Sequence, residues 1–355
     1  LFKQCREYLS SLNVDDKTIQ QAFNKAESEQ ISFINTLVEY NKNILKHAGG
    51  GETLTVMLAG RPYHTDSLIQ HKVSDMLSDM GVNVITDDLV RHLDIPVDDA
   101  HFVAQWAYTN RILKAAKWCA TQGQNVQFVE MTSFGCGPDA FLVDEVRDLL
   151  MRHNKSLTLL KLDDINNIGS MKLRVRSMIE SLKLANMNET EDIGVKDFAT
   201  VPVYDEFYRD HKILVPYFTP FISPLIPAIM KVAGYDAENL PLSDSDSSEW
   251  GLKYANNEVC YPATLIVGDI LKALKSGKYD VAKIAVAITQ TGGQCRASNY
   301  ISLIKKALVD AGYTDIPVIS ISVGSEIDNN QPAFKVNWMK VIPITFHAVL
   351  YSDCI

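Results

Sequence analysis

Three cysteines lie in short polar or glycine-rich stretches that lead into predicted helices. Cys136 lies in MTSFGCGPDA, Cys260 in NNEVCYPATL and Cys295 in ITQTGGQCRASNY. A helix N-terminus favours a negative group, and a thiolate is such a group. Glycines beside two of these cysteines let the backbone come close to a bound group. They are Gly135, Gly137, Gly292 and Gly293.

The residues alone leave three uses of these cysteines open. The thiolates can be ligands of one metal centre, with an iron–sulfur cluster favoured because thiolates select soft metals. They can instead be small buried core residues, or one can be a nucleophile. The separations between them, 124 and 35 residues, match no closely spaced metal-binding signature and do not decide the question.

Other chemically capable residues carry weaker signals. Arg61 and His64 lie in LAGRPYHTD, directly after a predicted strand. Arginine suits a phosphate or carboxylate and histidine suits proton transfer, so both are candidate catalytic residues. The alternative is that Arg61 pairs with an acidic neighbour and His64 caps the next helix. Cys119 lies on an amphipathic segment, where we expect a core residue.

The elements that must position these residues follow from hydrophobic periodicity. Residues 1–49 have helical spacing, and after them apolar runs alternate with amphipathic segments. This alternation predicts a parallel, doubly wound α/β fold. The predicted strands are 53–60, 82–88, 126–131, 157–163, 212–218, 283–289 and 317–323.

Two halves of the chain resemble each other, which favours duplication of one α/β unit. Pro62-Tyr63 matches Pro216-Tyr217, and Gly81 matches Gly234. His101 precedes Cys136 by 35 residues, and Cys260 precedes Cys295 by the same 35. We therefore expect four parts. They are a helical segment (1–49), a first α/β domain (50–185), a linker (186–210) and a second α/β domain, truncated at its end (211–355).

Composition and charge exclude some classes of function. The chain has 34 basic and 43 acidic residues without a basic cluster, so a nucleic-acid partner is not expected. The most apolar stretch, 216–235, contains four prolines and is not a membrane span. Widely spaced cysteines and the absence of a visible secretion signal favour the reducing cytoplasm. The chain begins at Leu1 without Met, so we expect a piece of a longer polypeptide.

Several of these motifs together resemble the 2-hydroxyacyl-CoA dehydratase superfamily. The similarity is greatest to the large acyl-CoA dehydratase activase-related proteins of anaerobic bacteria, and it extends over about residues 50–325. The motifs that carry it are GRPYHTD, TSFGCGPDA, LKLDDINNIGSMKLRVRS, NNEVCYPA and QTGGQCRASNY.

The resemblance implies two similar flavodoxin-like parallel-sheet domains and an enzyme of the lyase or oxidoreductase type. It also implies a 4Fe–4S or related iron–sulfur cluster, with Cys136, Cys260 and Cys295 as its ligands. We then expect the three sulfurs to lie within ~7 Å of one another, in a cleft between the two halves. The implied partners are an activase-type ATPase, which delivers a low-potential electron, and an acyl-CoA-like substrate. The alternative function is a non-catalytic docking or electron-relay module for the ATPase.

Overall fold

The computed structural model describes residues 1–47, 53–97, 100, 106–133, 137–162, 168–187, 199–290, 296–321 and 330–354. The chain divides into two compact units, which we describe separately. The first consists of Leu1–Pro96, Lys114–Met131 and Lys155–Asp192. The second consists of Val97–Leu113, Thr132–Asn154 and Ile193–Ile355. No helix in the described part of the chain is long and apolar enough to cross a bilayer.

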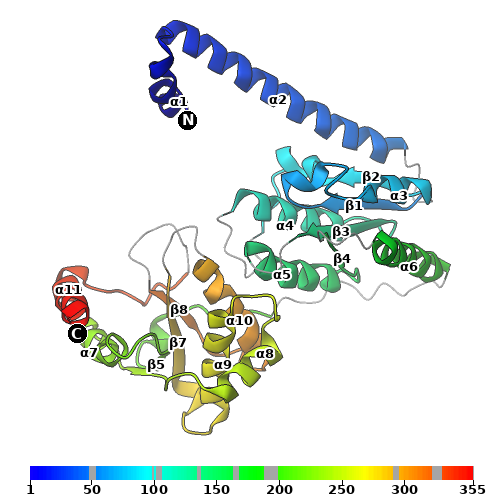
Figure 1. The fold of residues 1–355 in the computed structure, drawn as a ribbon. Helices are drawn as coiled ribbons and strands as arrows, with labels where there is room; N and C mark the ends of the chain where they lie inside the picture. The colour runs from blue at the N-terminus through cyan, green and yellow to red at the C-terminus, as the bar shows by residue number, and fades with distance from the viewer. Residues whose placement is uncertain are drawn as a thin grey trace. The chain divides into compact units, whose positions relative to one another are not determined.

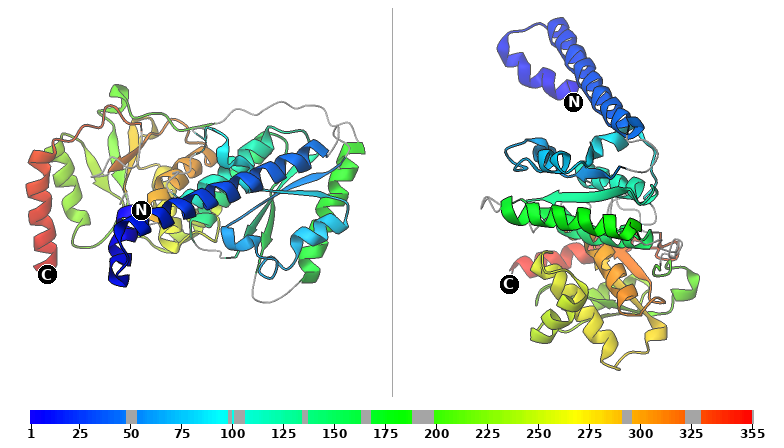
Figure 2. Two further views of the ribbon diagram at one scale, coloured as in Figure 1. Left: turned by 90° about the horizontal axis from the view of Figure 1, so that it is seen from above. Right: turned by 90° about the vertical axis from the view of Figure 1, so that its right-hand side faces the viewer.

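The helical character predicted for the N-terminal segment is confirmed. Helix α1 (Phe2–Leu9) folds back beside the start of the long helix α2 (Asp16–His47), where the rings of Phe2 and Phe23 are 5.2 Å apart (Figure 2). Asn41, in the C-terminal half of α2, attaches this helix to Thr86, elsewhere in the first unit. Its side chain accepts a hydrogen bond from the Thr86 amide (2.7 Å) and donates one to the Thr86 hydroxyl (3.2 Å).

The first sheet has the strand order β2-β1-β3-β4, and β1 is parallel to both of its neighbours (Figure 1). Its strands are β1 (Thr55–Ala59), β2 (Asn83–Thr86), β3 (Val126–Thr132) and β4 (Thr158–Lys161). Apolar side chains of the strands pack against Val73 and Leu77 of α3 (Val73–Asp79) and against Val175 and Ile179 of α6 (Ile168–Met187). Burial of this layer is the main stabilising contribution to the sheet.

The second sheet has the order β6-β5-β7-β8, again with parallel pairs. Its strands are β5 (Lys212–Val215), β6 (Ala237–Asn239), β7 (Ile284–Thr289) and β8 (Val318–Ile321). The helices after β5 are α7 (Ile226–Ala233), α8 (Ser245–Tyr254), α9 (Tyr261–Lys275), α10 (Tyr300–Asp310) and α11 (Trp338–Cys354). Two further helices, α4 (Ala107–Ala120) and α5 (Pro138–Arg152), precede β5 in the chain, and α5 belongs to the second unit.

The two sheets share one strand order, so the predicted pair of similar, doubly wound, flavodoxin-like domains is confirmed. The matching glycines also have matching roles. Gly81 (φ 76°) follows α3 before β2, and Gly234 (φ 91°) ends α7 before β6. A positive φ favours glycine because a side chain would clash with the backbone there.

The structure differs from the sequence prediction in three local features. The amphipathic segment 67–81 after the first strand predicts a helix over its whole length, but α3 begins only at Val73, because His71 and Lys72 adopt positive φ angles (51° and 59°) that a helix cannot contain. Strand β6 was not predicted, because its residues form no apolar run. Tyr204, inside the expected linker, is almost fully buried in the core of the second unit, where it packs edge-on against Phe334.

Candidate functional site

Cys260 is the N-cap residue of α9, directly before the first helical residue, Tyr261. It has extended backbone angles, and its carbonyl accepts a hydrogen bond from the Ala263 amide at 2.8 Å. Pro262 in the first turn lacks an N–H and fixes φ, which favours a helix start at this point. The Cys260 side chain is partly exposed. A thiol therefore lies at the N-terminus of a 15-residue helix, where a negative charge is stabilised.

Tyr300 connects Cys260 to two other helices. Its hydroxyl oxygen lies 3.0 Å from the Cys260 sulfur, and it is the first residue of α10. Its ring lies beside that of Phe141 in α5, with the ring centroids 6.3 Å apart. The N-terminal turns of α5, α9 and α10, all in the second unit, therefore meet around one tyrosine.

Asn256 joins α5 to the segment that precedes Cys260. Its side-chain amide donates to the Ala140 carbonyl (2.7 Å) and to the Asp144 carboxylate (2.6 Å). Its own side-chain carbonyl accepts from the Glu258 amide at 2.9 Å, which fixes the turn leading to Cys260. A single amide side chain thus holds the first two turns of α5 beside the start of α9.

A second polar contact fixes α5 against α10. The Lys306 ammonium group lies 2.6 Å from Asp148 of α5 and 2.9 Å from Asp310. Burial would lower the pKa of Lys306, but its hydrogen bonds to the two carboxylates outweigh that effect and raise the pKa above its usual value. The lysine is therefore charged at neutral pH and connects the two helices.

The other predicted ligands and glycines are only partly covered by the structure. Cys136, Cys295, Gly135, Gly292, Gly293 and His101 lie outside the described residues. Gly137 is described: it precedes α5 with a φ of 125°, a value that favours glycine. Among the described residues there is no group of three histidine, cysteine or acidic side chains able to hold a metal ion. The convergence of the three cysteines stays a prediction.

His64 is completely buried, with 0% of its surface exposed. Its Nδ1 accepts a hydrogen bond from the Arg61 amide at 3.0 Å, so the neutral ring carries its proton on Nε2. A β-carbon at Gly60 would lie 2.6 Å from this nitrogen, so only glycine fits beside the ring. Asp66, rather than His64, accepts the amides of the following turn, including that of Leu68 at 2.8 Å.

These contacts show that His64 holds the turn after β1 and thereby the backbone of Arg61. The Arg61 side chain is partly exposed at the carboxyl end of the strand, where parallel sheets bind ligands. The candidate catalytic roles of Arg61 and His64 stay predictions. For His64, contact with a substrate requires that the buried ring become accessible.

Cys119 is a core residue, as predicted. It is completely buried, its sulfur donates to the Val126 carbonyl at 3.5 Å, and burial raises its pKa to about 12. Lys155 lies beside it and donates to the carbonyls of Cys119 (2.6 Å), Gly123 (3.0 Å) and Val126 (2.8 Å). Burial lowers the pKa of this lysine, and its three hydrogen bonds satisfy all three ammonium protons.

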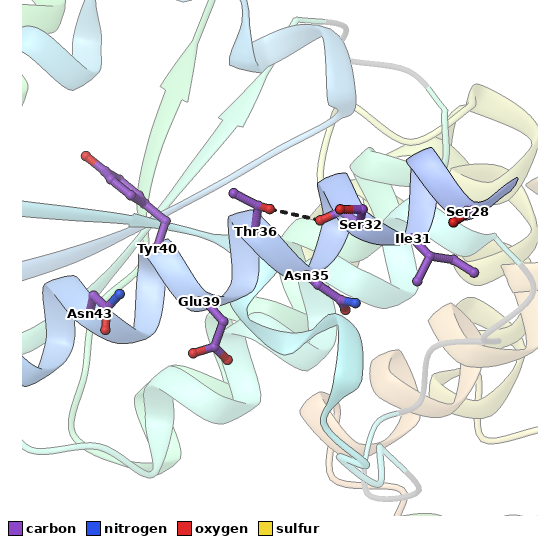
Figure 3. Close-up of a pocket in the computed structure, with 8 residues that line it drawn as sticks. All are labelled: Ser28, Ile31, Ser32, Asn35, Thr36, Glu39, Tyr40 and Asn43. Atoms are coloured by element: carbon purple, nitrogen blue, oxygen red, sulfur yellow. Dashed lines mark hydrogen bonds between the residues drawn. The ribbon is translucent and has the colours of Figure 1, made fainter. Parts of the chain in front are cut away.

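The grooves found in the first unit do not resemble a catalytic site. One of about 610 Å³ follows α2, and Figure 3 shows Thr36 and Tyr40 leaving the helix on one side and Asn35 and Glu39 on the other. These side chains do not converge on one point. Another groove, of about 380 Å³, lies between α3 and α6 and is lined by Met76, Met80 and Arg176, among others. None of the described lining residues is a cysteine or histidine.

Sequence reasoning missed Tyr300 and Asn256 as site residues. Both lie in the motifs quoted above, QTGGQCRASNY and NNEVCYPA. Their partners are distant in sequence: Tyr300 is 40 residues from Cys260, and Asn256 is 116 residues from Ala140. Local spacing carries no signal for such contacts, although a polar residue close to a candidate ligand within a motif is itself a clue.

Comparison with known protein families gives a match to the N-terminal part of the chain. Residues 1–90 match the family described as "CoA enzyme activase uncharacterised domain (DUF2229)". This match covers about a quarter of the chain, from α1 to η3, the short 3-10 helix Asp87–His92, and includes Arg61 and His64 but none of the three candidate ligands. No curated protein matches the chain. The match associates the N-terminal quarter with CoA enzyme activases.

Proposed function

We propose that this chain is the iron–sulfur module of an ATP-dependent, low-potential reductase or radical dehydratase acting on CoA thioesters. Cys136, Cys260 and Cys295 would hold a 4Fe–4S cluster. The observation that carries the proposal is the position of Cys260: a partly exposed thiol at the start of α9, in contact with the first residue of α10.

Chain connectivity supports the involvement of the other two cysteines. Cys136 is the residue before Gly137, which precedes α5, and Cys295 is five residues before Tyr300. Five residues of chain span at most roughly 18 Å. Since α5, α9 and α10 belong to one unit and are joined by Tyr300, Asn256 and Lys306, the described residues nearest in sequence to Cys136 and Cys295 belong to the same group of helix N-termini as Cys260.

The chemistry of the site fits an iron–sulfur cluster. Thiolates are the usual ligands of such clusters, and a cluster with thiolate ligands would be an anion, which the N-termini of α5, α9 and α10 would stabilise. When bound, such a cluster would supply single low-potential electrons to a thioester substrate, and three cysteine ligands would leave one iron without a protein ligand. Tyr300 and Asn256 would hold the start of α9, and with it Cys260, in place.

The family match supports the proposed partner and substrate class. A segment associated with CoA enzyme activases within the same chain is consistent with electron delivery by an activase-type ATPase and with an acyl-CoA-like substrate. Arg61, whose backbone His64 holds after the carboxyl end of β1, would then bind a phosphate or carboxylate of that substrate.

Anaerobic reconstitution tests the proposal. The chain is incubated with iron, sulfide and a reductant, desalted, and analysed for iron, sulfide and absorbance. We expect roughly four irons per chain and a broad band near ~400 nm that bleaches on reduction. Absence of both under strict anaerobiosis would contradict the proposal and favour the docking or electron-relay module.

A further inference from the structure

We infer that Tyr300 is a positioning residue of the metal site: its hydroxyl donates a hydrogen bond to the Cys260 sulfur and raises the reduction potential of the cluster that this sulfur ligates. This inference rests on the proposed function. It adds a residue outside the ligand set and assigns to it a measurable effect on the cluster.

The direction of the hydrogen bond follows from the chemistry of the two groups. The sulfur and the hydroxyl oxygen are 3.0 Å apart, and in the free protein either can be the donor. A metal-bound cysteine is a thiolate and has no proton to donate. Once Cys260 ligates iron, the tyrosine hydroxyl is the only possible donor of the pair.

The surrounding structure fixes the tyrosine hydroxyl in this place. Tyr300 begins α10, and the residues on either side of it, Asn299 and Ile301, are buried. Its ring lies beside Phe141 of α5, so that contacts from two helices set its orientation. A donor held in this way needs little reorganisation when the sulfur gains negative charge.

A hydrogen bond to a ligand sulfur changes the relative stability of the two oxidation states. Reduction adds negative charge to the cluster and its thiolates, and the donor stabilises that charge. The reduced state is therefore favoured and the potential is higher than it would be without the hydroxyl. Removing the hydroxyl must shift the potential to more negative values.

The substitution Tyr300→Phe removes the hydroxyl and keeps the ring beside Phe141. Tyr261→Phe is the matched control, because Tyr261 adjoins Cys260 in sequence but its side chain is 60% exposed. Both variants and the wild type are reconstituted anaerobically, their iron content is measured, and the potential is determined by redox titration with EPR detection. We expect equal iron content in all three proteins and a more negative potential in Tyr300→Phe alone.

The possible failures are distinguishable. A cluster in all three proteins with the same potential would overturn the role of Tyr300 and leave the proposed function intact. Loss of iron in Tyr300→Phe, with a native circular dichroism spectrum, would also overturn it, because the hydroxyl would then be needed for ligation rather than for the potential. Absence of a cluster from the wild type would overturn both proposals.

Discussion

Cys119 and Cys260 lie at opposite ends of their helices and have opposite surroundings. Cys119 is the second-last residue of α4 and is completely buried, and its thiol donates a hydrogen bond to a carbonyl. Cys260 precedes the first residue of α9, is partly exposed and has a hydroxyl as its neighbour. Burial disfavours the thiolate at Cys119 and raises its pKa to about 12.

This comparison indicates that the position of a cysteine along its helix decides which role it can have. At the end of α4 the Cys119 carbonyl accepts a hydrogen bond from the Lys155 ammonium group, and a positive charge is favourable at a helix C-terminus. At the start of α9 the free amides require a negative charge, which a thiolate supplies. The same residue type is structural in the first unit and a candidate ligand in the second.

The largest expected difference between the two cysteines is in their reaction with iodoacetamide. In the metal-free protein at pH 8, we expect Cys260 to react at least ~100-fold faster than Cys119, because a thiol with a pKa of about 12 is thiolate in only ~0.01% of molecules. Cys119 should stay unreactive from pH 7 to 10, still below its pKa. Peptide mass spectrometry measures both rates.

Denaturant provides the control for this experiment. In the unfolded chain both thiols are exposed and should react at comparable rates. Comparable rates in the folded protein would contradict the contrast between the two helix ends.

Lys155→Met tests the structural end of the comparison. The substitution removes three charge-assisted hydrogen bonds to buried carbonyls, and we expect the free energy of unfolding to fall by about 3 kcal/mol. Urea denaturation measures the change. Lys172→Met, on the exposed side of α6, is the control and should change stability by less than ~0.5 kcal/mol. Equal effects of the two substitutions would show that Lys155 does not stabilise the end of α4.

Asn256→Leu tests the support of the candidate site. The change removes the hydrogen bonds to Ala140 and Asp144, and we expect a loss of about 1–2 kcal/mol in the free energy of unfolding. The matched control is Asn257→Leu at the adjacent exposed position. If the control loses as much stability, the contact between Asn256 and α5 does not hold the start of α9 in place.

Much of the fold could be predicted because buried parallel strands form continuous apolar runs. Strands β1 and β7 lie within the predicted ranges, and β3 extends one residue beyond its predicted range, to Thr132. The repeat predicted a common strand order for the two sheets. The polar edge strand β6 could not be found this way. Its pairing with β5 depends on neighbouring elements rather than on its own residues.

The candidate site could be predicted only as a set of cysteines. Cys260 was identified from its place before Pro262, a local signal for a helix start. The contacts that surround it come from α5 and α10 and depend on tertiary packing, which no local pattern encodes. The same is true of Lys155, whose three carbonyl partners lie 29 to 36 residues away.

The central claim is that Cys260 ligates an iron–sulfur cluster and Cys119 does not. Its most direct test is the iron content of Cys260→Ser and Cys119→Ser, reconstituted anaerobically beside the wild type. A hydroxyl is a harder and less acidic ligand than a thiolate, so Cys260→Ser should lose most of its iron. Cys119→Ser should bind as much as the wild type. Equal iron content in the two variants would contradict the account, because binding would then not depend on the proposed ligand.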